Sequence, residues 1–240
     1  MFAALCKWAE FVKLSHTVFA LPFALAAMVV AARDHHGWPG WRVFGLILVA
    51  MFCARTCAMA FNRIVDRDFD AANPRTANRH LPAGQISILD AVVLCALAGA
   101  GLVGAAWLLN PVCFYLSPVA LFFVCFYSLT KRFTDYTHVW LGVALALAPV
   151  GAWLAVKGQL GFTAVEPSFG IGPLGKLVAE QGWTGILPLV LGVAVIFWLI
   201  GFDIIYAIQD YEFDRTHGLR SVVVAWGPKN ALNEIGRAHV

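Results

Sequence analysis

Long apolar runs separated by short polar segments dominate the chain. At about 1.5 Å per residue, each run is long enough to cross roughly 30 Å of hydrocarbon as a helix. A further apolar segment begins near Leu219 and would start a seventh span. The pattern predicts an all-α, polytopic transmembrane helical bundle in a single domain, residues 1–240. Its six complete spans are 14–32, 41–61, 88–109, 112–130, 138–156 and 186–206.

The composition supports this class. Of the 240 residues, 60% are hydrophobic and only 13% are charged. A soluble core cannot hold that much apolar surface, so we expect an integral membrane protein embedded in the lipid bilayer. The net charge of +3 is too small to indicate a nucleic-acid partner. No dinucleotide-binding, P-loop or Ser-His-Asp pattern is present, and the six cysteines lack zinc-site spacing, so we expect reduced thiols packed between helices.

The basic residues are distributed unequally between the two membrane faces. If the spans alternate in direction, thirteen of the seventeen Lys and Arg residues lie at the face where spans 41–61, 112–130 and 186–206 end. Cytoplasmic loops of membrane proteins carry the excess of basic residues. We therefore predict that this face is cytoplasmic, in the inner membrane of a bacterium.

Two sets of polar residues close apolar runs on that same face. The first acidic ladder is Asn62, Asp66 and Asp70; the second acidic ladder is Asp203, Tyr206, Asp210 and Asp214. Steps of four residues, or of three plus four, place side chains on one face of a helix. Carboxylates at this depth are costly unless a positive charge neutralises them, and they usually mark a functional site. Two facing rows of carboxylates are what divalent cations and a polyphosphate require.

The residue types favour Mg²⁺ as the cofactor. Asp66 and Asp70 would clasp one ion between adjacent helical turns, and Asp210 and Asp214 would clasp another. Asn62 adds a neutral oxygen or an amide donor. Hard oxygen ligands beside phosphate select Mg²⁺, which shares its coordination sphere with the substrate.

Five basic residues accompany the ladders. They would bind diphosphate oxygens or the carboxylate of an acceptor. For the Lys131-Arg132 pair alone, a plain stop-transfer signal is the alternative. The five are Arg55, deep in a span, Arg75 and Arg79 in the loop after the first ladder, and Lys131 and Arg132 at a span end.

Two segments resemble the paired signatures of the UbiA superfamily of intramembrane prenyltransferases. The first is NRIVDRDFD (62–70) followed by NPRTANRHLPAG (73–84), and the second is DIIYAIQDYEFDRTHGLRS (203–221). Three shorter stretches, at 13–24, 127–132 and 147–153, look like the 4-hydroxybenzoate polyprenyltransferase branch.

The resemblance implies about nine spans around a central cavity with a lateral opening. It also implies Mg²⁺-dependent transfer of a prenyl group from polyprenyl diphosphate to an aromatic acid. By the motif match, Asp203 and Tyr206 would line the site, and Arg55, Lys131 and Arg79 would contact diphosphate or acceptor. Mg²⁺ and diphosphate would be held by Asn62, Asp66, Asp70, Asp210 and Asp214.

We predict transfer to 4-hydroxybenzoate in ubiquinone-type quinone biosynthesis. Within the family, prenylation of a dihydroxynaphthoate in menaquinone biosynthesis is the alternative. In a different class, the alternative is a cation-coupled membrane transporter with carboxylates at the midplane. The basic residues beside both ladders favour an anionic diphosphate over a bare cation.

The end of the chain carries two further expectations. The family pattern continues beyond about six spans, so we expect an exposed apolar groove where later helices would pack. Residues 234–240 (EIGRAHV) back-translate to a string that contains the start of a common sequencing-library adapter. We therefore expect this segment to be non-native and to make few contacts with the bundle.

Overall fold

The computed structural model describes residues 2–13, 20–33, 36–159 and 186–237, with side chains from 7 to 233. Within these ranges the regular structure is entirely helical. The helices are α1 (Phe2–Phe11), α2 (Leu21–Ala31), α3 (Trp41–Val65), α4 (Arg67–Ala72), α5 (Ile88–Leu109), α6 (Pro111–Thr130), α7 (Thr137–Lys157), α9 (Leu187–Ala207), η4 (Ile208–Asp210), α10 (Tyr211–Thr216), α11 (Val222–Trp226) and α12 (Pro228–Arg237).

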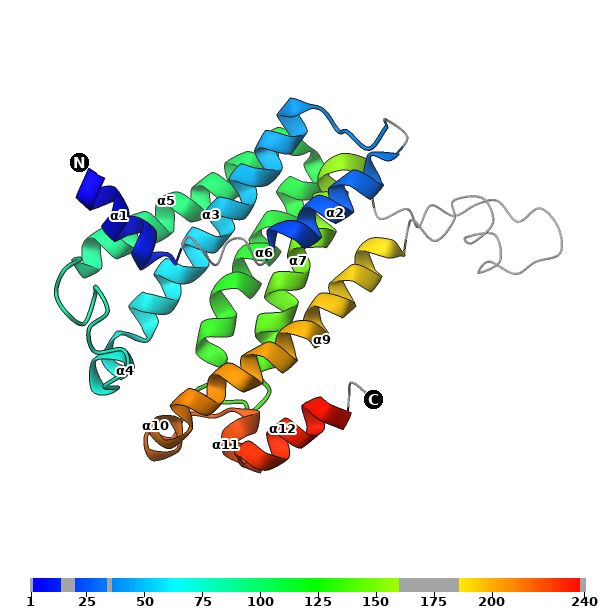
Figure 1. Cartoon of the computed structure of the whole chain (residues 1–240). Coiled ribbons are helices and arrows are strands. Elements are labelled where there is room, and N and C mark those ends of the chain that lie inside the picture. Colours follow the sequence, from blue (N-terminus) through cyan, green and yellow to red (C-terminus); the bar gives the residue numbers. More distant parts are fainter. Residues whose placement is uncertain (1, 14–19, 34–35, 160–185, 238–240) are drawn as a thin grey trace.

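Five helices are long and apolar enough to cross a membrane: α3, α5, α6, α7, and α9 together with its continuation to Thr216. Successive long helices run in opposite directions, so the end of α3 and the end of α9 lie at the same end of the bundle (Figure 1). The predicted all-α transmembrane bundle is confirmed in class.

Local sequence fixes the helix starts that set this topology. Ser87 caps α5 by accepting a hydrogen bond from the Asp90 N–H at 3.1 Å. Asn110 caps α6 by accepting from the Cys113 N–H at 2.9 Å, and Pro111 follows at the first helical position, where no amide hydrogen is needed. The Asn110 side-chain amide also donates to the Leu154 carbonyl at 2.9 Å, which ties the α5–α6 turn to the end of α7.

Small residues let the helices approach closely. A Cβ added at Gly142 of α7 would lie 3.1 Å from the Ile196 Cα of α9, and one at Gly101 of α5 would lie 2.7 Å from Cys53 Sγ of α3. In a bilayer, helix association depends on such close packing, because lipid removes most of the hydrophobic driving force. The five cysteines whose side chains are described are free thiols, as the sequence predicts.

The two ends of the apolar pattern differ in detail from the prediction. The first predicted span, 14–32, is described only from Ala20 onward, where α2 has 11 residues, so the number of spans stays a prediction. The segment expected to open a seventh span forms two short helices, α11 and α12. Gly227, at φ +80°, ends α11, and Pro228 begins α12 at the first helical position, where no amide hydrogen is needed.

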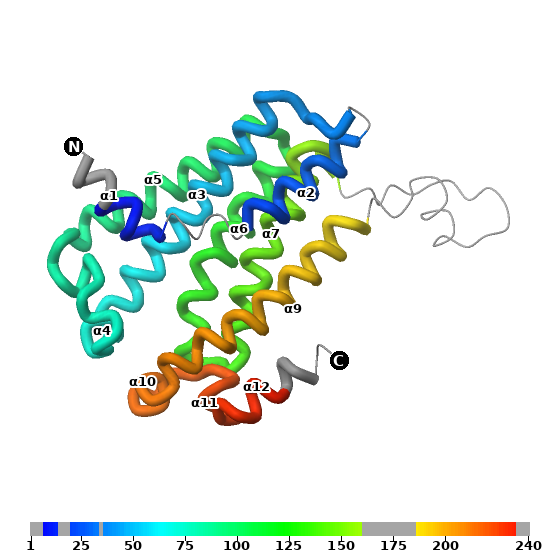
Figure 2. Tube along the Cα trace, in the orientation of Figure 1, coloured from blue at the N-terminus to red at the C-terminus, as the bar shows by residue number. Residues whose placement is uncertain are grey.

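Helices α11 and α12 lie across the end of the bundle beside α9 (Figure 2). Val222, Val223 and Ala231 pack against Ile204 of α9 in one buried cluster. On α9 itself, Val190, Val193, Phe197 and Ile205 are each more than half exposed. Any lipid-facing helix shows such exposure, so the groove for later helices stays a prediction. The expectation for residues 234–240 concerns side chains outside the described residues.

Candidate diphosphate and metal site

The first acidic ladder crosses a break between two helices. Helix α3 ends at Val65, Asp66 is its C-cap, and α4 begins at Arg67. The Asp66 N–H still donates to the Asn62 carbonyl at 3.0 Å, and the Asp70 N–H donates to the Asp66 carbonyl at 2.8 Å. These bonds carry the four-residue spacing through the break. Both carboxylates are buried, with Asp66 3% and Asp70 6% exposed.

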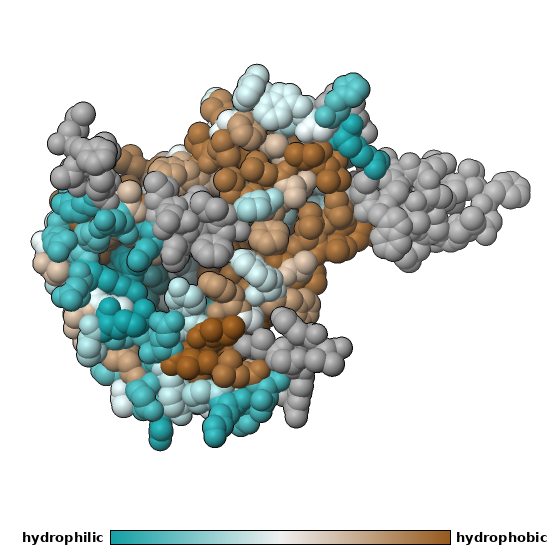
Figure 3. Space-filling model, in the orientation of Figure 1, coloured by the Kyte–Doolittle hydropathy of each residue, from teal (hydrophilic) through white to brown (hydrophobic). Residues whose placement is uncertain are grey.

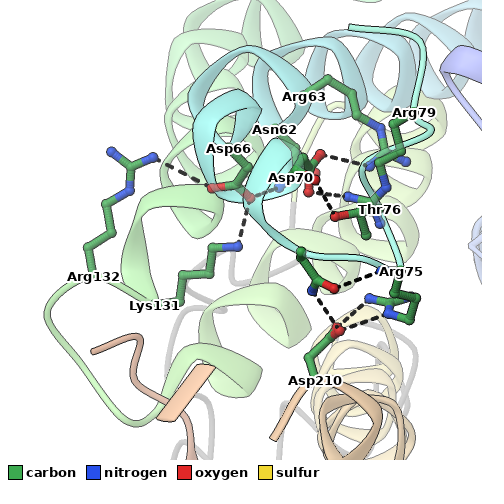
Figure 4. A network of polar contacts seen from close by, with 11 residues as sticks. Asn62, Arg63, Asp66, Asp70, Arg75, Thr76, Arg79, Lys131, Arg132 and Asp210 are labelled. Carbon is green, nitrogen blue, oxygen red and sulfur yellow. Dashed lines mark hydrogen bonds and ion pairs between the residues drawn. The ribbon is translucent and has the colours of Figure 1, made fainter. Parts of the chain in front are cut away.

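Asp66 is held by the basic pair at the end of α6 (Figure 4). Lys131 Nζ lies 2.9 Å from Asp66 Oδ2, and Arg132 Nη2 lies 3.5 Å from Oδ1. The Asn62 amide donates to Oδ2 at 3.0 Å, and Arg132 also donates to the Val65 carbonyl. The basic pair therefore contacts the first ladder directly, which a plain stop-transfer signal would not require.

Asp70 has two arginine partners. Arg79 Nη1 donates to Oδ1 at 2.6 Å, and Arg63 Nη1 lies 3.6 Å from Oδ2. The Thr76 hydroxyl donates to the Asp70 carbonyl at 2.9 Å, which holds the following loop against α4. Sequence reasoning did not include Arg63. A signal was present, because residues 63 and 70 are seven apart and share a helix face.

Asp210 joins the second acidic ladder to the loop after the first. Arg75 Nε donates to Asp210 Oδ1 at 2.7 Å, and Arg75 Nη2 donates to Oδ2. The Asn73 amide donates to Oδ1 at 3.1 Å, while the Asn73 oxygen accepts from the Arg75 N–H at 3.0 Å. The hydrogen bond to Asp210 raises the pKa of the Arg75 guanidinium, which stays charged. These contacts confirm that both ladders reach the same end of the bundle.

The rest of the second ladder takes other positions. The Asp203 Oδ2 atom lies 2.6 Å from Nδ1 of His138, near the start of α7, and only 3% of the His138 side chain is exposed. Tyr206 is 47% exposed and its ring packs on Phe202, with centroids 5.1 Å apart. Among the described residues, none forms a hydrogen bond or ion pair with the Asp214 carboxylate, whereas the Asp214 carbonyl accepts from the Leu219 N–H at 2.9 Å. His138 was assigned no role from sequence, where it is a lone histidine at a span start.

Arg55 lies on a different surface, the wall of an apolar cavity of about 260 Å³ between α3, α5, α6 and α7. Tyr127 and Ser117 add the other polar groups to a lining of Ala, Leu, Val and Ile side chains. The Nε atom of Arg55 is buried and has no hydrogen-bond partner among the residues that the structure describes. A buried donor without a partner costs about 1–3 kcal/mol. The cavity is therefore suited to a ligand with an apolar body and an anionic end.

The ladder residues fit a hard divalent cation by their chemistry. Within the described ranges, no three His, Cys, Asp or Glu side chains converge as a ready-made metal cluster. The Asp66 Oδ1 and Asp70 Oδ2 atoms are nevertheless buried without a hydrogen bond. Such oxygens have lone pairs to offer, and carboxylate oxygens are the ligands that Mg²⁺ takes beside phosphate. The predicted ligands Asp66, Asp70 and Asp210 lie at the same end of the bundle, each already beside a cation.

Polar side chains gather around α4, whereas apolar side chains cover the surface over α2 and α3 (Figure 3). The described site brings three ladder carboxylates together with five cations at one membrane face. These five cations are Arg63, Arg75, Arg79, Lys131 and Arg132. The fold and this site define the class of protein: an integral membrane helical bundle with a charged site at one end. Residues 20–238 match the UbiA prenyltransferase family, and the chain belongs to that family.

Individual relatives show how far the similarity extends. The chain is 29% identical over 211 residues to a 4-hydroxybenzoate octaprenyltransferase of Shewanella sediminis, covering 88% of this chain and 64% of the relative. It is 28% identical over 227 residues to that of Shewanella oneidensis, covering 92% and 70%. The chain thus spans about two thirds of the length of these curated relatives.

Two solved structures share the fold. A UbiA homolog from Aeropyrum pernix K1 matches with a TM-score of 0.74 and 34% identity over 91% of this chain and 72% of that one. A UbiA homolog from Archaeoglobus fulgidus, solved with DMAPP and Mg²⁺, matches with a TM-score of 0.68 and 21% identity over 96% and 73%.

Proposed function

We propose that this chain catalyses Mg²⁺-dependent transfer of a polyprenyl group from polyprenyl diphosphate to 4-hydroxybenzoate, a step of ubiquinone-type quinone biosynthesis. The observation that carries the proposal is the convergence of Asp66, Asp70 and Asp210 with five cations at one membrane face. The names of the Shewanella relatives and the DMAPP and Mg²⁺ in the Archaeoglobus structure support the same chemistry.

The diphosphate would lie among the five cations. Arginine forks match phosphate oxygens in pairs, and Lys131 supplies a point charge. Asn62, Asp66, Asp70, Asp210 and Asp214 would hold Mg²⁺, which when bound neutralises charge developing on the leaving diphosphate. Lys131 and Arg132 would keep the diphosphate fixed while the allylic C–O bond breaks and its electron pair leaves with the diphosphate.

The acceptor would lie in the apolar cavity with its carboxylate on Arg55. The cavity wall excludes water, which would otherwise capture the allylic cation. A ring carbon beside the phenol oxygen supplies the electron pair of the new C–C bond, and the ring then loses the proton from that carbon. The path between the diphosphate at the bundle end and the acceptor in the cavity is proposed to be lined by Tyr206 and by Asp203, which His138 holds.

The transporter alternative fits the charges less well. A cation pathway needs carboxylates that a bare cation can reach. Here Asp66, Asp70 and Asp210 each have an arginine or lysine partner. We further propose that this end faces the cytoplasm of a bacterial inner membrane, because alternation of the predicted spans assigns thirteen of the seventeen basic residues to that side.

The decisive experiment is turnover in lipid nanodiscs. The protein is supplied with Mg²⁺, octaprenyl diphosphate and either 4-hydroxybenzoate or 1,4-dihydroxy-2-naphthoate, and released diphosphate and prenylated product are measured together. We expect product from 4-hydroxybenzoate, none with EDTA, and none from Asp66→Asn. The matched control is Arg67→Gln, because among the described residues Arg67 pairs only with the exposed Asp68.

Each other outcome has a defined meaning. Product from the naphthoate alone would move the acceptor to the menaquinone route. Cation flux across vesicles without diphosphate release from any aromatic acid would replace the enzyme by a transporter.

A further inference from the structure

We propose that Arg75 is an exchangeable counter-ion of Asp210, which a divalent cation must displace and which a diphosphate draws away. Diphosphate binding would then open Asp210 to the metal, so that the two ligands bind cooperatively. This inference rests on the proposed function. It adds to that function a residue that couples the two ligands.

The contacts of Asp210 differ from those of the other ladder acids. Arg75 occupies both Asp210 oxygens, and Asn73 adds a third hydrogen bond. Asp66 and Asp70, in contrast, each retain one buried oxygen that accepts no hydrogen bond. A metal ion at those two oxygens meets only ion pairs longer than a hydrogen bond, with Arg132 Nη2 3.5 Å from Asp66 Oδ1 and Arg63 Nη1 3.6 Å from Asp70 Oδ2. At Asp210 it competes with a bidentate, charge-assisted pair.

Arg75 is placed to move without disturbing its loop. Its side chain is 44% exposed, whereas that of Arg63 is 7% exposed. The loop has separate anchors on α4, namely the Thr76 hydroxyl on the Asp70 carbonyl and the Arg79 guanidinium on the Asp70 carboxylate. The Arg75 side chain can therefore change partner while the backbone stays in place.

The charge balance of the site gives the sign of the coupling. Four of the five ladder aspartates, Asp66, Asp70, Asp210 and Asp214, lie near five cations, whereas the fifth, Asp203, pairs with His138 away from them. The bundle-end site therefore has one more cation than carboxylates. A metal ion alone increases that surplus, and a diphosphate alone brings negative charge beside four carboxylates. Together they compensate each other, and Arg75 has a new anionic partner when it leaves Asp210.

The test compares the two ligands separately in Arg75→Gln. Binding of Mn²⁺ without diphosphate is followed by electron paramagnetic resonance, and binding of inorganic diphosphate in EDTA by calorimetry. We expect Mn²⁺ to bind about fivefold tighter or more, because its competitor is gone. We expect diphosphate to bind about fivefold weaker or more, because a phosphate ligand is gone. A merely structural role would weaken both.

Two further variants keep the test decisive. Arg67→Gln removes a nearby exposed cation whose ion pair among the described residues is with Asp68 and not with Asp210. Because solvent screens the Arg67 charge, the affinities for Mn²⁺ and for diphosphate should each change by no more than about twofold. Arg75→Lys keeps the charge but loses the fork, so Mn²⁺ affinity should rise by a smaller factor, which tests the sign if the Gln variant does not fold.

The failures of the two proposals are distinguishable. Unchanged or weaker Mn²⁺ binding in a folded Arg75 variant, while the wild type binds Mn²⁺, would overturn the exchange and leave the metal site intact. Absence of Mn²⁺ binding by the wild type, even with a prenyl diphosphate present, would overturn the metal site and the proposed function with it.

Discussion

Replacing Arg55 by leucine removes a guanidinium from the wall of the apolar cavity and leaves the charged cluster at the bundle end intact. The Arg55 Nε atom is buried without a hydrogen-bond partner among the described residues, so the carboxylate of the aromatic substrate would accept its hydrogen bond. A hydrogen bond to a charged group contributes about 1.5–3 kcal/mol. A loss of about 2 kcal/mol corresponds to roughly a thirtyfold rise in KM for the aromatic acid.

The assay is steady-state turnover with each substrate varied in turn. KM for polyprenyl diphosphate should change by less than about threefold in Arg55→Leu, since the cations at the bundle end are proposed to bind that substrate. In Arg55→Leu, the KM for an acceptor without a carboxylate, such as phenol, should no longer exceed the KM for 4-hydroxybenzoate. Arg55→Lys retains charge and should fall between wild type and leucine, because ammonium lacks the guanidinium fork.

A stability measurement separates this reading from a structural role. With no acid present, Arg55→Leu should melt at the wild-type temperature or higher, because it replaces a buried donor lacking a partner with an apolar side chain. Equal increases in KM for both substrates would assign Arg55 to the diphosphate instead. A strongly lowered melting temperature would make Arg55 a structural residue and refute the acceptor site.

Three further predictions concern other parts of the molecule. Alanine at any one of the four aspartates proposed to hold Mg²⁺ should remove most turnover, measured as diphosphate release. Near-normal rates in two of the variants Asp66→Ala, Asp70→Ala, Asp210→Ala and Asp214→Ala would contradict a shared site. Gly142→Ala should destabilise the α7–α9 packing by about 1–3 kcal/mol in denaturant unfolding, since the added Cβ would meet Ile196 at 3.1 Å. The control Gly104→Ala, with open space around its Cβ, should be neutral or stabilising by up to about 1 kcal/mol. Equal effects of the two substitutions on the free energy of unfolding would contradict the close approach of α7 and α9. His138→Ala should lower kcat more than either KM, with His138→Gln retaining a donor to Asp203 and recovering part of the rate; unchanged kcat in both would show that the Asp203 contact has no part in turnover.

Several features of this protein follow from the sequence because they depend on neighbouring residues. The apolar runs define the membrane helices, and the four-residue spacing of Asn62, Asp66 and Asp70 survives the break after Val65 because backbone hydrogen bonds continue across it. Alternation of direction then brings the ends of α3 and α9 to one face, as Asn73 and Asp210 confirm.

The partner of each charge depends on the tertiary structure. Arg75 selects Asp210, 135 residues away, and not the nearer Asp70, which Arg79 and Arg63 hold. Asp203 pairs with His138 because α7 and α9 pack closely enough at Gly142 to bring these side chains into contact. Spacing along a helix fixes which face of the helix a side chain takes. The residue opposite that side chain depends on how closely and at what angle two helices cross. Residues far apart in the chain together determine that crossing.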